Sequence, residues 1–187
     1  MANKIRYGLK NVHYAVLGQS GYGTPVAWPG AVSLTLNREG ADSSDFYADD
    51  GIYYTFGAVN GGYSGDLEMA FLPDSIAQAL LGEVSSDGGS FELASKEPVE
   101  FALMCEMQGN DSSIGLVLYG CKASRPNTTA NTKGENPSAD TQTLNIRIAG
   151  HDYTIDGTSE RVIKFKKEGV TSSFFSAVPT PGSSLSA

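Results

Sequence analysis

The amino-acid sequence predicts a mainly β protein with one short helix, and three observations support this prediction. Glycine and tyrosine are abundant, with 22 and 9 copies among 187 residues, while only 18% of the residues are charged. Such a composition favours turn-rich β structure over a helical protein. Apolar and polar residues alternate with period two in several stretches, whereas one stretch has the features of a helix. The length suits a single domain with a proper core.

Strands are predicted where period-two alternation gives one apolar face, or where a short apolar run is bounded by turn residues. They are residues 10–17, 32–36, 63–72, 91–93, 99–107, 114–121, 141–149 and 161–167. In the third of these, Leu67, Met69 and Phe71 share the apolar face. Asp66 and Glu68 share the polar face of the same strand. The polar turn after residue 107 predicts a hairpin of the two strands that flank it.

The predicted helix runs from Pro73 to Leu81. Proline suits the first helical turn, and Asp74 suits the positive N-terminal end of the helix dipole. Apolar residues form one stripe along the segment, and Gly82 can end the helix in the left-handed conformation. Because the helix is short, we expect it to pack on the sheet.

The stretch from Asn37 to Gly62 has neither period, and it is predicted as a long loop between strands. Loops longer than about 12 to 15 residues are usually binding elements, lids or linkers. Its aromatic side chains gain by burial, which disfavours plain disorder, and its aspartates need water or a basic partner. We therefore expect the loop to contact another protein. The residues expected in this contact are Phe46, Tyr47, Asp49, Asp50, Tyr53 and Tyr54.

One β domain is predicted over residues 1–175. The polar segment 125–140 has no aromatic residue and is expected to be exposed and mobile. Residues 176–187 are mostly small and include two prolines. They are predicted to form a flexible C-terminal tail unless a partner orders them.

The distribution of charge says more than its total. The formal charge of −8 argues against general binding to nucleic acid, which needs a basic face. Residues 1–36 hold bases and no acid, whereas residues 37–74 hold eight acids and one base. Complementary regions of this kind can orient copies of a chain head to tail, although a merely acidic, solvated surface is the alternative. The candidate basic partners are Lys4, Arg6, Arg161, Lys164, Lys166 and Lys167.

No catalytic arrangement is predicted, so we expect a protein that is not an enzyme and needs no cofactor or metal. His13 and His151 have no metal-ligand neighbour at a useful spacing, and a zinc site that adds the two cysteines is a minor alternative. Cys105 and Cys121 are expected to be free, buried thiols. A calcium site among the aspartates of residues 42–50 fails the EF-hand spacing. A hydrolase with two convergent carboxylates stays open, because acids are abundant.

Four segments carry a family resemblance. They are KIRYGLKNVHYAVL at residues 4–17, YGTPVAWPGAVSLTL at 22–36, FYADDGIYYTF at 46–56 and NGGYSGDLEMAFLPDSIAQALLG at 60–82. Together they resemble the major tail proteins of long-tailed bacteriophages, in the group that forms the tube of non-contractile tails. The resemblance implies a β-sandwich or partly closed barrel with one flanking helix. It also implies a structural role, in which hexameric rings stack into a tube through which DNA travels.

Under this resemblance, the loop at residues 37–62 reaches a neighbouring subunit, and an acidic lumen lets DNA pass without specific binding. The acids expected to face the lumen are Asp66, Glu68, Glu100 and Glu106. Besides other copies of the chain, the implied partners are tape-measure, tail-terminator and tail-tip proteins. The implied location is the virion tail, after assembly in the host cytoplasm.

Two further expectations concern membranes and ligands. No stretch approaches the roughly 18 apolar residues of a membrane span, so no membrane contact is expected. The alternative function is a carbohydrate- or host-surface-binding β domain of a virion. Abundant tyrosine and Trp28 support this alternative, because aromatic faces bind such ligands.

Overall fold

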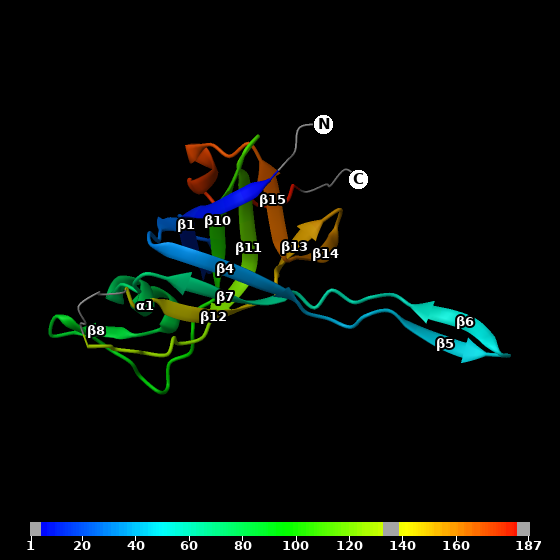
Figure 1. The fold of residues 1–187 in the computed structure, drawn as a ribbon, viewed down its shortest axis with the longest axis horizontal. Helices are drawn as coiled ribbons and strands as arrows, with labels where there is room; N and C mark the ends of the chain where they lie inside the picture. Colours follow the sequence, from blue (N-terminus) through cyan, green and yellow to red (C-terminus); the bar gives the residue numbers. More distant parts are fainter. Residues whose placement is uncertain (1–4, 133–138, 183–187) are drawn as a thin grey trace.

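The computed structural model describes residues 5–132 and 139–182, and the fold is mainly β with one α-helix in this part of the chain, as the sequence predicts (Figure 1). The elements are β1 (Arg6–Gly18), β2 (Gly21–Tyr22), β3 (Val26–Ala27), β4 (Ala31–Arg38), β5 (Ser44–Ala48), β6 (Gly51–Phe56), β7 (Tyr63–Met69), α1 (Asp74–Leu81), β8 (Val84–Ser86), β9 (Gly89–Phe91), β10 (Phe101–Gly109), β11 (Ile114–Ala123), β12 (Gln142–Ile148), β13 (His151–Ile155), β14 (Thr158–Val162), β15 (Lys164–Glu168) and the 3-10 helix η1 (Ser172–Phe175).

The largest sheet is antiparallel and folds into two layers. Its strand order is β2-β1-β10-β11-β12-β7-β4, with β15 also on β11 and β3 also on β1. Strand β11 pairs with β15 through residues 114–118 and with β12 through residues 121–123. The first layer therefore holds β15, β11, β10 and β1, and the second holds β12, β7 and β4. Within the described chain β4 approaches β1 without pairing with it, so the fold is sandwich-like and the barrel is not closed.

Gly120 lies at the point where β11 changes partner. Its φ is 62°, and a Cβ atom there would lie 2.1 Å from the carbonyl oxygen of Gly150. Its N–H donates to the hydroxyl of Tyr22 at 3.0 Å, and its carbonyl accepts from the N–H of Ala149 at 3.1 Å. Glycine is required here because the backbone is both left-handed and closely approached.

The main core lies between the two layers and beneath α1. Leu67, Met69 and Leu144 are fully buried in it, and the helix adds Ile76 and Leu80 among its buried residues. The helix follows Pro73 and ends at Gly82, whose φ of 73° is the left-handed cap that the sequence predicts. The predicted hairpin of β10 and β11 is also confirmed.

A second core covers the other face of β10 and β11. It contains Met104, Val117, Tyr119 and Phe174, which explains why β10 and β11 carry nearly continuous buried runs and not an alternating pattern. The hydroxyl of Tyr119 donates to the carbonyl of Pro179 at 2.6 Å.

Within residues 176–182, the described part of the predicted tail, Val178 and Pro179 contact this second core. Val178 contacts it directly, and the carbonyl of Pro179 provides the acceptor that the buried Tyr119 hydroxyl needs. The rest of the predicted tail, residues 183–187, lies outside the described residues.

The polar segment 125–140 is anchored at its start. Arg125 donates to the carbonyls of Leu81 and Lys96, both at 3.3 Å, and its Nε lies 2.7 Å from a carboxylate oxygen of Glu92. Residues 127–132 are exposed as expected, and residues 133–138 lie outside the described chain. One apolar assignment is wrong: Phe71 is exposed, because β7 ends at Met69 before the chain turns towards α1.

The long connection between β4 and β7 is present, but the expectation that it lacks strand structure is wrong. It forms a hairpin of β5 and β6 that projects from the body (Figure 1). Asp49 and Asp50 form its two-residue turn with φ of 51° and 60°, the positive values that a tight hairpin turn needs. The sequence of this hairpin shows no alternation of apolar and polar residues, because neither face of the hairpin is buried and aromatic residues occupy both faces. We call residues 39–61 the arm.

Replacement of Gly120 is expected to destabilise the fold strongly. In Gly120→Ala, the left-handed backbone conformation costs the alanine about 1–2 kcal/mol, and its Cβ also clashes with the Gly150 carbonyl. We therefore expect the free energy of unfolding to fall by more than about 2 kcal/mol. The control is Gly157→Ala, since Gly157 has a φ of 77° but no heavy atom within 4 Å of an added Cβ. Denaturant unfolding of both variants measures the difference. Equal losses would contradict the role given to Gly120.

The two thiols are expected to be unreactive in the folded protein. Cys105 and Cys121 are free and buried, and burial raises the pKa of the Cys105 thiol to about 12. Because the thiolate is the reactive form, a chromogenic disulfide reagent at pH 8 should label neither cysteine until denaturant is added. Rapid labelling of the native protein would contradict this placement.

Candidate functional site

Three surfaces of the described chain are candidate functional sites: the arm, an apolar groove and a polar sheet face. The arm is the most exposed of them. Phe46, Tyr53, Tyr54 and Phe56 are each between 53% and 72% exposed. Large aromatic groups on both strands of a projecting hairpin are typical of an interaction surface.

Ring contacts organise the aromatics of the arm. Phe46 lies opposite Tyr54 in the β5–β6 register, and the rings of Tyr54 and Phe56 are 4.9 Å apart in an edge-on arrangement. The ring of Phe46 also meets that of Tyr53, with centroids 6.4 Å apart. We call these four side chains the aromatic face of the arm. Tyr47 and Ile52 face each other on the other side.

The base of the arm continues the β4–β7 ladder. The N–H of Glu39 donates to the carbonyl of Gly62, and the N–H of Val59 donates to that of Ala41, both at 2.9 Å. Arg38 forms an ion pair with Asp42 near this base. The arm is therefore fixed in direction at its base while its tip carries Asp49 and Asp50 into solvent.

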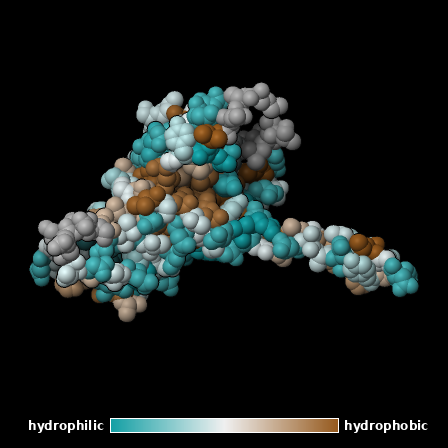
Figure 2. Space-filling model, viewed as in Figure 1, coloured by the Kyte–Doolittle hydropathy of each residue, from teal (hydrophilic) through white to brown (hydrophobic). Residues whose placement is uncertain are grey.

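The groove lies on the open side of the sandwich, where β4 approaches β1. Its volume is about 480 Å³. The residues that line it are Arg6, Tyr7, Gly8, Leu9, Val32, Leu34, Leu36, Met107 and Leu116. Figure 2 shows hydrophobic surface gathered at the centre of this view, on the side of the body where β4 and β1 lie in Figure 1. Because the barrel does not close here, part of the core is open to solvent.

The polar face is the outer side of β4, β7 and β12, and it contains two of the predicted lumen acids. Its residues form three rows across the strands: Ser33, Glu68 and Thr143; Thr35, Asp66 and Asn145; and Asn37, Ser64 and Arg147. Side chains of neighbouring residues donate hydrogen bonds to both carboxylates. Glu68 accepts from the hydroxyls of Ser33 at 2.9 Å and Thr141 at 2.7 Å, and Asp66 accepts from the amide of Asn145.

Hydrogen bonds lower the pKa of Glu68 and of Glu39. The hydroxyls of Thr141 and Ser33 hold the pKa of Glu68 below its usual value. The hydroxyl of Ser64, with a smaller contribution from Arg147, does the same for the pKa of Glu39. Arg147 is engaged in turn, since it lies 3.5 Å from Glu39 and donates to the carbonyl of Gly61 at 3.2 Å.

The other two predicted lumen acids do not lie on the polar face. Glu106 is buried on β10, where it accepts from the amide of Asn11 at 2.7 Å and lies 3.2 Å from Nζ of Lys10. Burial alone would raise the pKa of Glu106, but these partners outweigh it and hold the pKa below its usual value. A buried, paired carboxylate cannot line a channel of the same subunit. No sequence signal distinguished it from the exposed acids.

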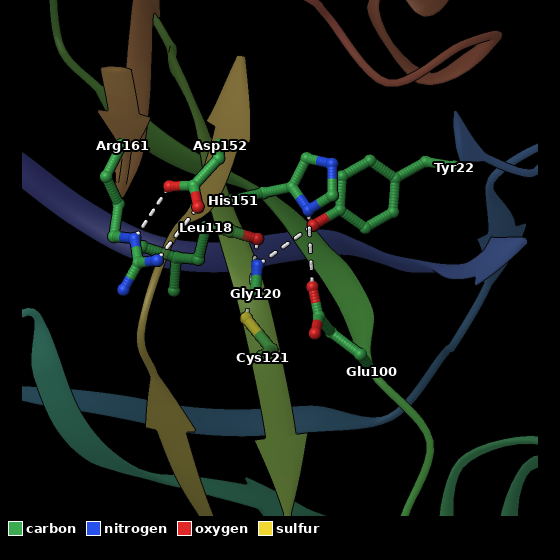
Figure 3. Close-up of polar contacts among 8 residues, drawn as sticks. All are labelled: Tyr22, Glu100, Leu118, Gly120, Cys121, His151, Asp152 and Arg161. Carbon is green, nitrogen blue, oxygen red and sulfur yellow. Dashed lines mark hydrogen bonds and ion pairs between the residues drawn. The ribbon is translucent and has the colours of Figure 1, made fainter. Parts of the chain in front are cut away.

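Glu100 belongs to a cluster around the start of β13, shown in Figure 3. A carboxylate oxygen of Glu100 lies 3.4 Å from Nδ1 of His151, whose ring meets that of Tyr22 at 5.2 Å. Beside it, Arg161 donates twice to Asp152, at 2.8 and 2.9 Å. The Glu100–His151 and His151–Tyr22 contacts join β2 to the start of β13, and the hydroxyl of Tyr22 accepts from the N–H of Gly120 on β11. This is a structural role.

The predicted basic partners have different surroundings in the structure. Arg161 is paired with Asp152, and Lys164 donates to the hydroxyl of Tyr63 at 2.8 Å. Arg6 lines the groove, while Lys166 and Lys167 are exposed on β15. Lys4 lies outside the described residues.

His13 and Trp28, which the sequence offers for a metal site and for a sugar site, pack against other aromatic rings in the structure. His13 stacks on Phe175 with centroids 4.5 Å apart, and no group of three or more His, Cys, Asp or Glu in the described chain could hold a metal ion. Trp28 is fully buried, with its ring edge-on to Tyr14, so it offers no surface for stacking against a sugar. No helix within residues 5–132 and 139–182 is long and apolar enough to cross a bilayer.

No protein-family model matches the chain, and no curated protein matches it in sequence.

Acid is expected to destabilise the fold partly through Glu68. Its pKa is lower in the folded state than the ordinary 4.5, so its carboxylate stabilises the fold above about pH 4.5, and this contribution is lost as pH falls through the folded-state pKa. Glu68→Gln should therefore lose fewer degrees of melting temperature than the wild type between pH 7 and pH 3. Melting curves across this range measure the effect. Glu97→Gln, at an exposed position before β10, is the control. A control that matches Glu68→Gln would contradict the assignment.

Proposed function

We propose that this protein is a structural subunit that assembles with copies of itself into stacked rings, forming the tail tube of a bacteriophage. The resemblance of the sequence supports this proposal, and the arm is the observation that carries it. A projecting hairpin with exposed aromatic residues and an acidic turn has no use within its own subunit. It suits a contact with a neighbouring one.

The energetics of the arm favour a cooperative assembly. Fully burying one large apolar side chain contributes about 1.5–3 kcal/mol, and the four side chains of the aromatic face are 53–72% exposed, so the face offers roughly 4–7 kcal/mol. Association of two proteins costs about 4–15 kcal/mol in lost translational and rotational freedom. One arm contact is therefore marginal. Rings and stacks, in which each subunit makes several contacts at once, are favoured over isolated pairs.

The polar face suits the wall of a channel for DNA. Its exposed groups are hydroxyls, amides and the carboxylates of Asp66 and Glu68, while Arg147 is engaged by Glu39. A wall of this kind offers few free cations to phosphates, so it avoids the release of counterions that makes DNA adhere to proteins. In the proposed tube this face lines the lumen, and DNA passes without specific binding.

The first test is self-assembly. Negative-stain electron microscopy of the purified protein over a concentration series should show rings with a central hole, or tubes. Asp49→Asn together with Asp50→Asn should reduce assembly at low salt, since these acids are proposed to meet basic groups of the neighbour. Tyr47→Ala should raise the concentration needed for assembly by about tenfold or more.

The chain provides matched controls for the acidic tip. Asp87 and Asp156 also lie in hairpin turns with positive φ, at 53° and 51°. Asp87→Asn and Asp156→Asn should leave assembly unchanged, because asparagine tolerates the same backbone conformation. A wild-type protein that stays monomeric over the whole concentration series would contradict the proposed function. Variants of the arm that assemble normally would contradict the role of the arm in the assembly.

A further inference from the structure

Two apolar features of this chain have no partner within the described residues: the groove and the aromatic face of the arm. In the groove, Tyr7 and Val32 are 56% and 51% exposed, although Leu9 and Leu116 beside them belong to the main core. The arm of the same chain points away from the body, so it does not cover its own groove (Figure 1). Each copy thus carries one apolar projection and one apolar recess.

The two features fit each other in chemistry. The groove offers an apolar floor from Leu34, Leu36 and Met107, in a volume of about 480 Å³ that suits inserted aromatic side chains. The aromatic face of the arm supplies such side chains from a hydrogen-bonded two-stranded ribbon. Because the ribbon is preformed, little conformational entropy is lost when it docks.

Charged side chains border both features. Arg6 lines the groove, and Lys166 lies opposite Leu116 in the β11–β15 register, so it shares the face of β11 that lines the groove. Asp111 and Glu168 lie with these two bases in the adjoining recess. The arm carries Asp49 and Asp50 at its tip. Opposite charges placed in this way orient the encounter of an arm with a groove and discourage contacts between two arms.

The direction of β4 sets the symmetry of such a contact. Val32 and Leu34, near the start of β4, line the groove, and the arm leaves from the other end of the same strand. At about 3.3 Å per extended residue, the path from Arg38 to the Asp49 turn spans on the order of 35 Å. An arm that docks on a second copy joins two different surfaces, and where the second copy does not return its own arm, the contact is head-to-tail and repeats into rings or filaments.

From these observations we infer that the groove between β1 and β4 receives the aromatic face of the arm of a second copy of this chain. The inference rests on the proposed self-assembly and specifies the surface that drives it. The contact buries Phe46, Tyr53, Tyr54 and Phe56 against the open core, and the tip acids meet Arg6 and Lys166 of the receiving copy.

The test uses complementation between two variants that each lack half of the contact. The arm variant carries Phe46→Ala and Tyr54→Ala and keeps an intact groove. The groove variant carries Val32→Asp and keeps an intact arm. All three positions are more than half exposed, so folding should persist, and circular dichroism of each variant checks this. Phe91→Ala is the matched control, because Phe91 is as exposed as Phe46, at 53%, but lies on the β8–β9 hairpin.

Sedimentation velocity measures the outcome. Each variant alone should need at least about tenfold more protein than the wild type to associate, and should sediment as a 19.7 kDa monomer where the wild type forms multimers. An equimolar mixture should form a heterodimer and stop there, because one intact arm meets one intact groove. Phe91→Ala should behave as the wild type.

The other outcomes separate this inference from the proposed function. Variants that assemble as the wild type does would overturn the arm-to-groove contact and leave self-assembly standing. Monomeric variants whose mixture stays monomeric would show that the arm and the groove bind elsewhere, which also overturns the contact alone. A wild type that remains monomeric at every concentration would overturn both.

Discussion

The partner change of β11 is the constraint on which the rest of the structure depends. Residues 114–118 hold β15 and residues 121–123 hold β12, so a single strand serves two layers. The change is made at Gly120, whose left-handed backbone lies against Gly150. Because β15 occupies the first half of β11, the layer of β12, β7 and β4 diverges there. Its last strand, β4, then approaches β1 without pairing. The groove is thus a consequence of how β11 divides its hydrogen bonds.

The arm extends the β4–β7 ribbon beyond the core, and its stability comes from that attachment. An isolated two-stranded hairpin is marginal in water, but the hydrogen bonds of Glu39 and Ala41 continue the ladder of the sheet into the arm. Exposed aromatics on a ribbon are an aggregation hazard, and the acids at the tip oppose unspecific contacts between arms. The same aromatics gain free energy when an apolar recess covers them. Specificity and solubility therefore have a common origin in the charge of Asp49 and Asp50.

The charged side chains of the polar face have hydrogen-bond partners within the same subunit. Glu68 and Asp66 are held by hydroxyl and amide donors of the neighbouring strands, and Arg147 is held by Glu39 and the Gly61 carbonyl. Such a face needs no ligand to complete it. It differs in this from the arm and the groove, whose apolar groups gain free energy only when another surface covers them. The three surfaces therefore divide into one suited to repel a passing polyanion and two suited to bind a partner.

The sequence by itself determined the elements whose signal is local. Alternation placed β4, β7 and β12, the Pro73 and Gly82 caps bounded α1, and the absence of a period in residues 37–62 separated the long connection from the strands of the body. Tertiary structure decided the rest. The arm is a hairpin with no buried face, so it has no period to read. Glu106 is buried beside Lys10 and Asn11, whereas Glu68 is only half-buried. The groove joins residues of β1, β4, β10 and β11, which are distant in the chain. Periodicity reports which face of one strand is apolar, but only the packing of strands decides whether that face is covered.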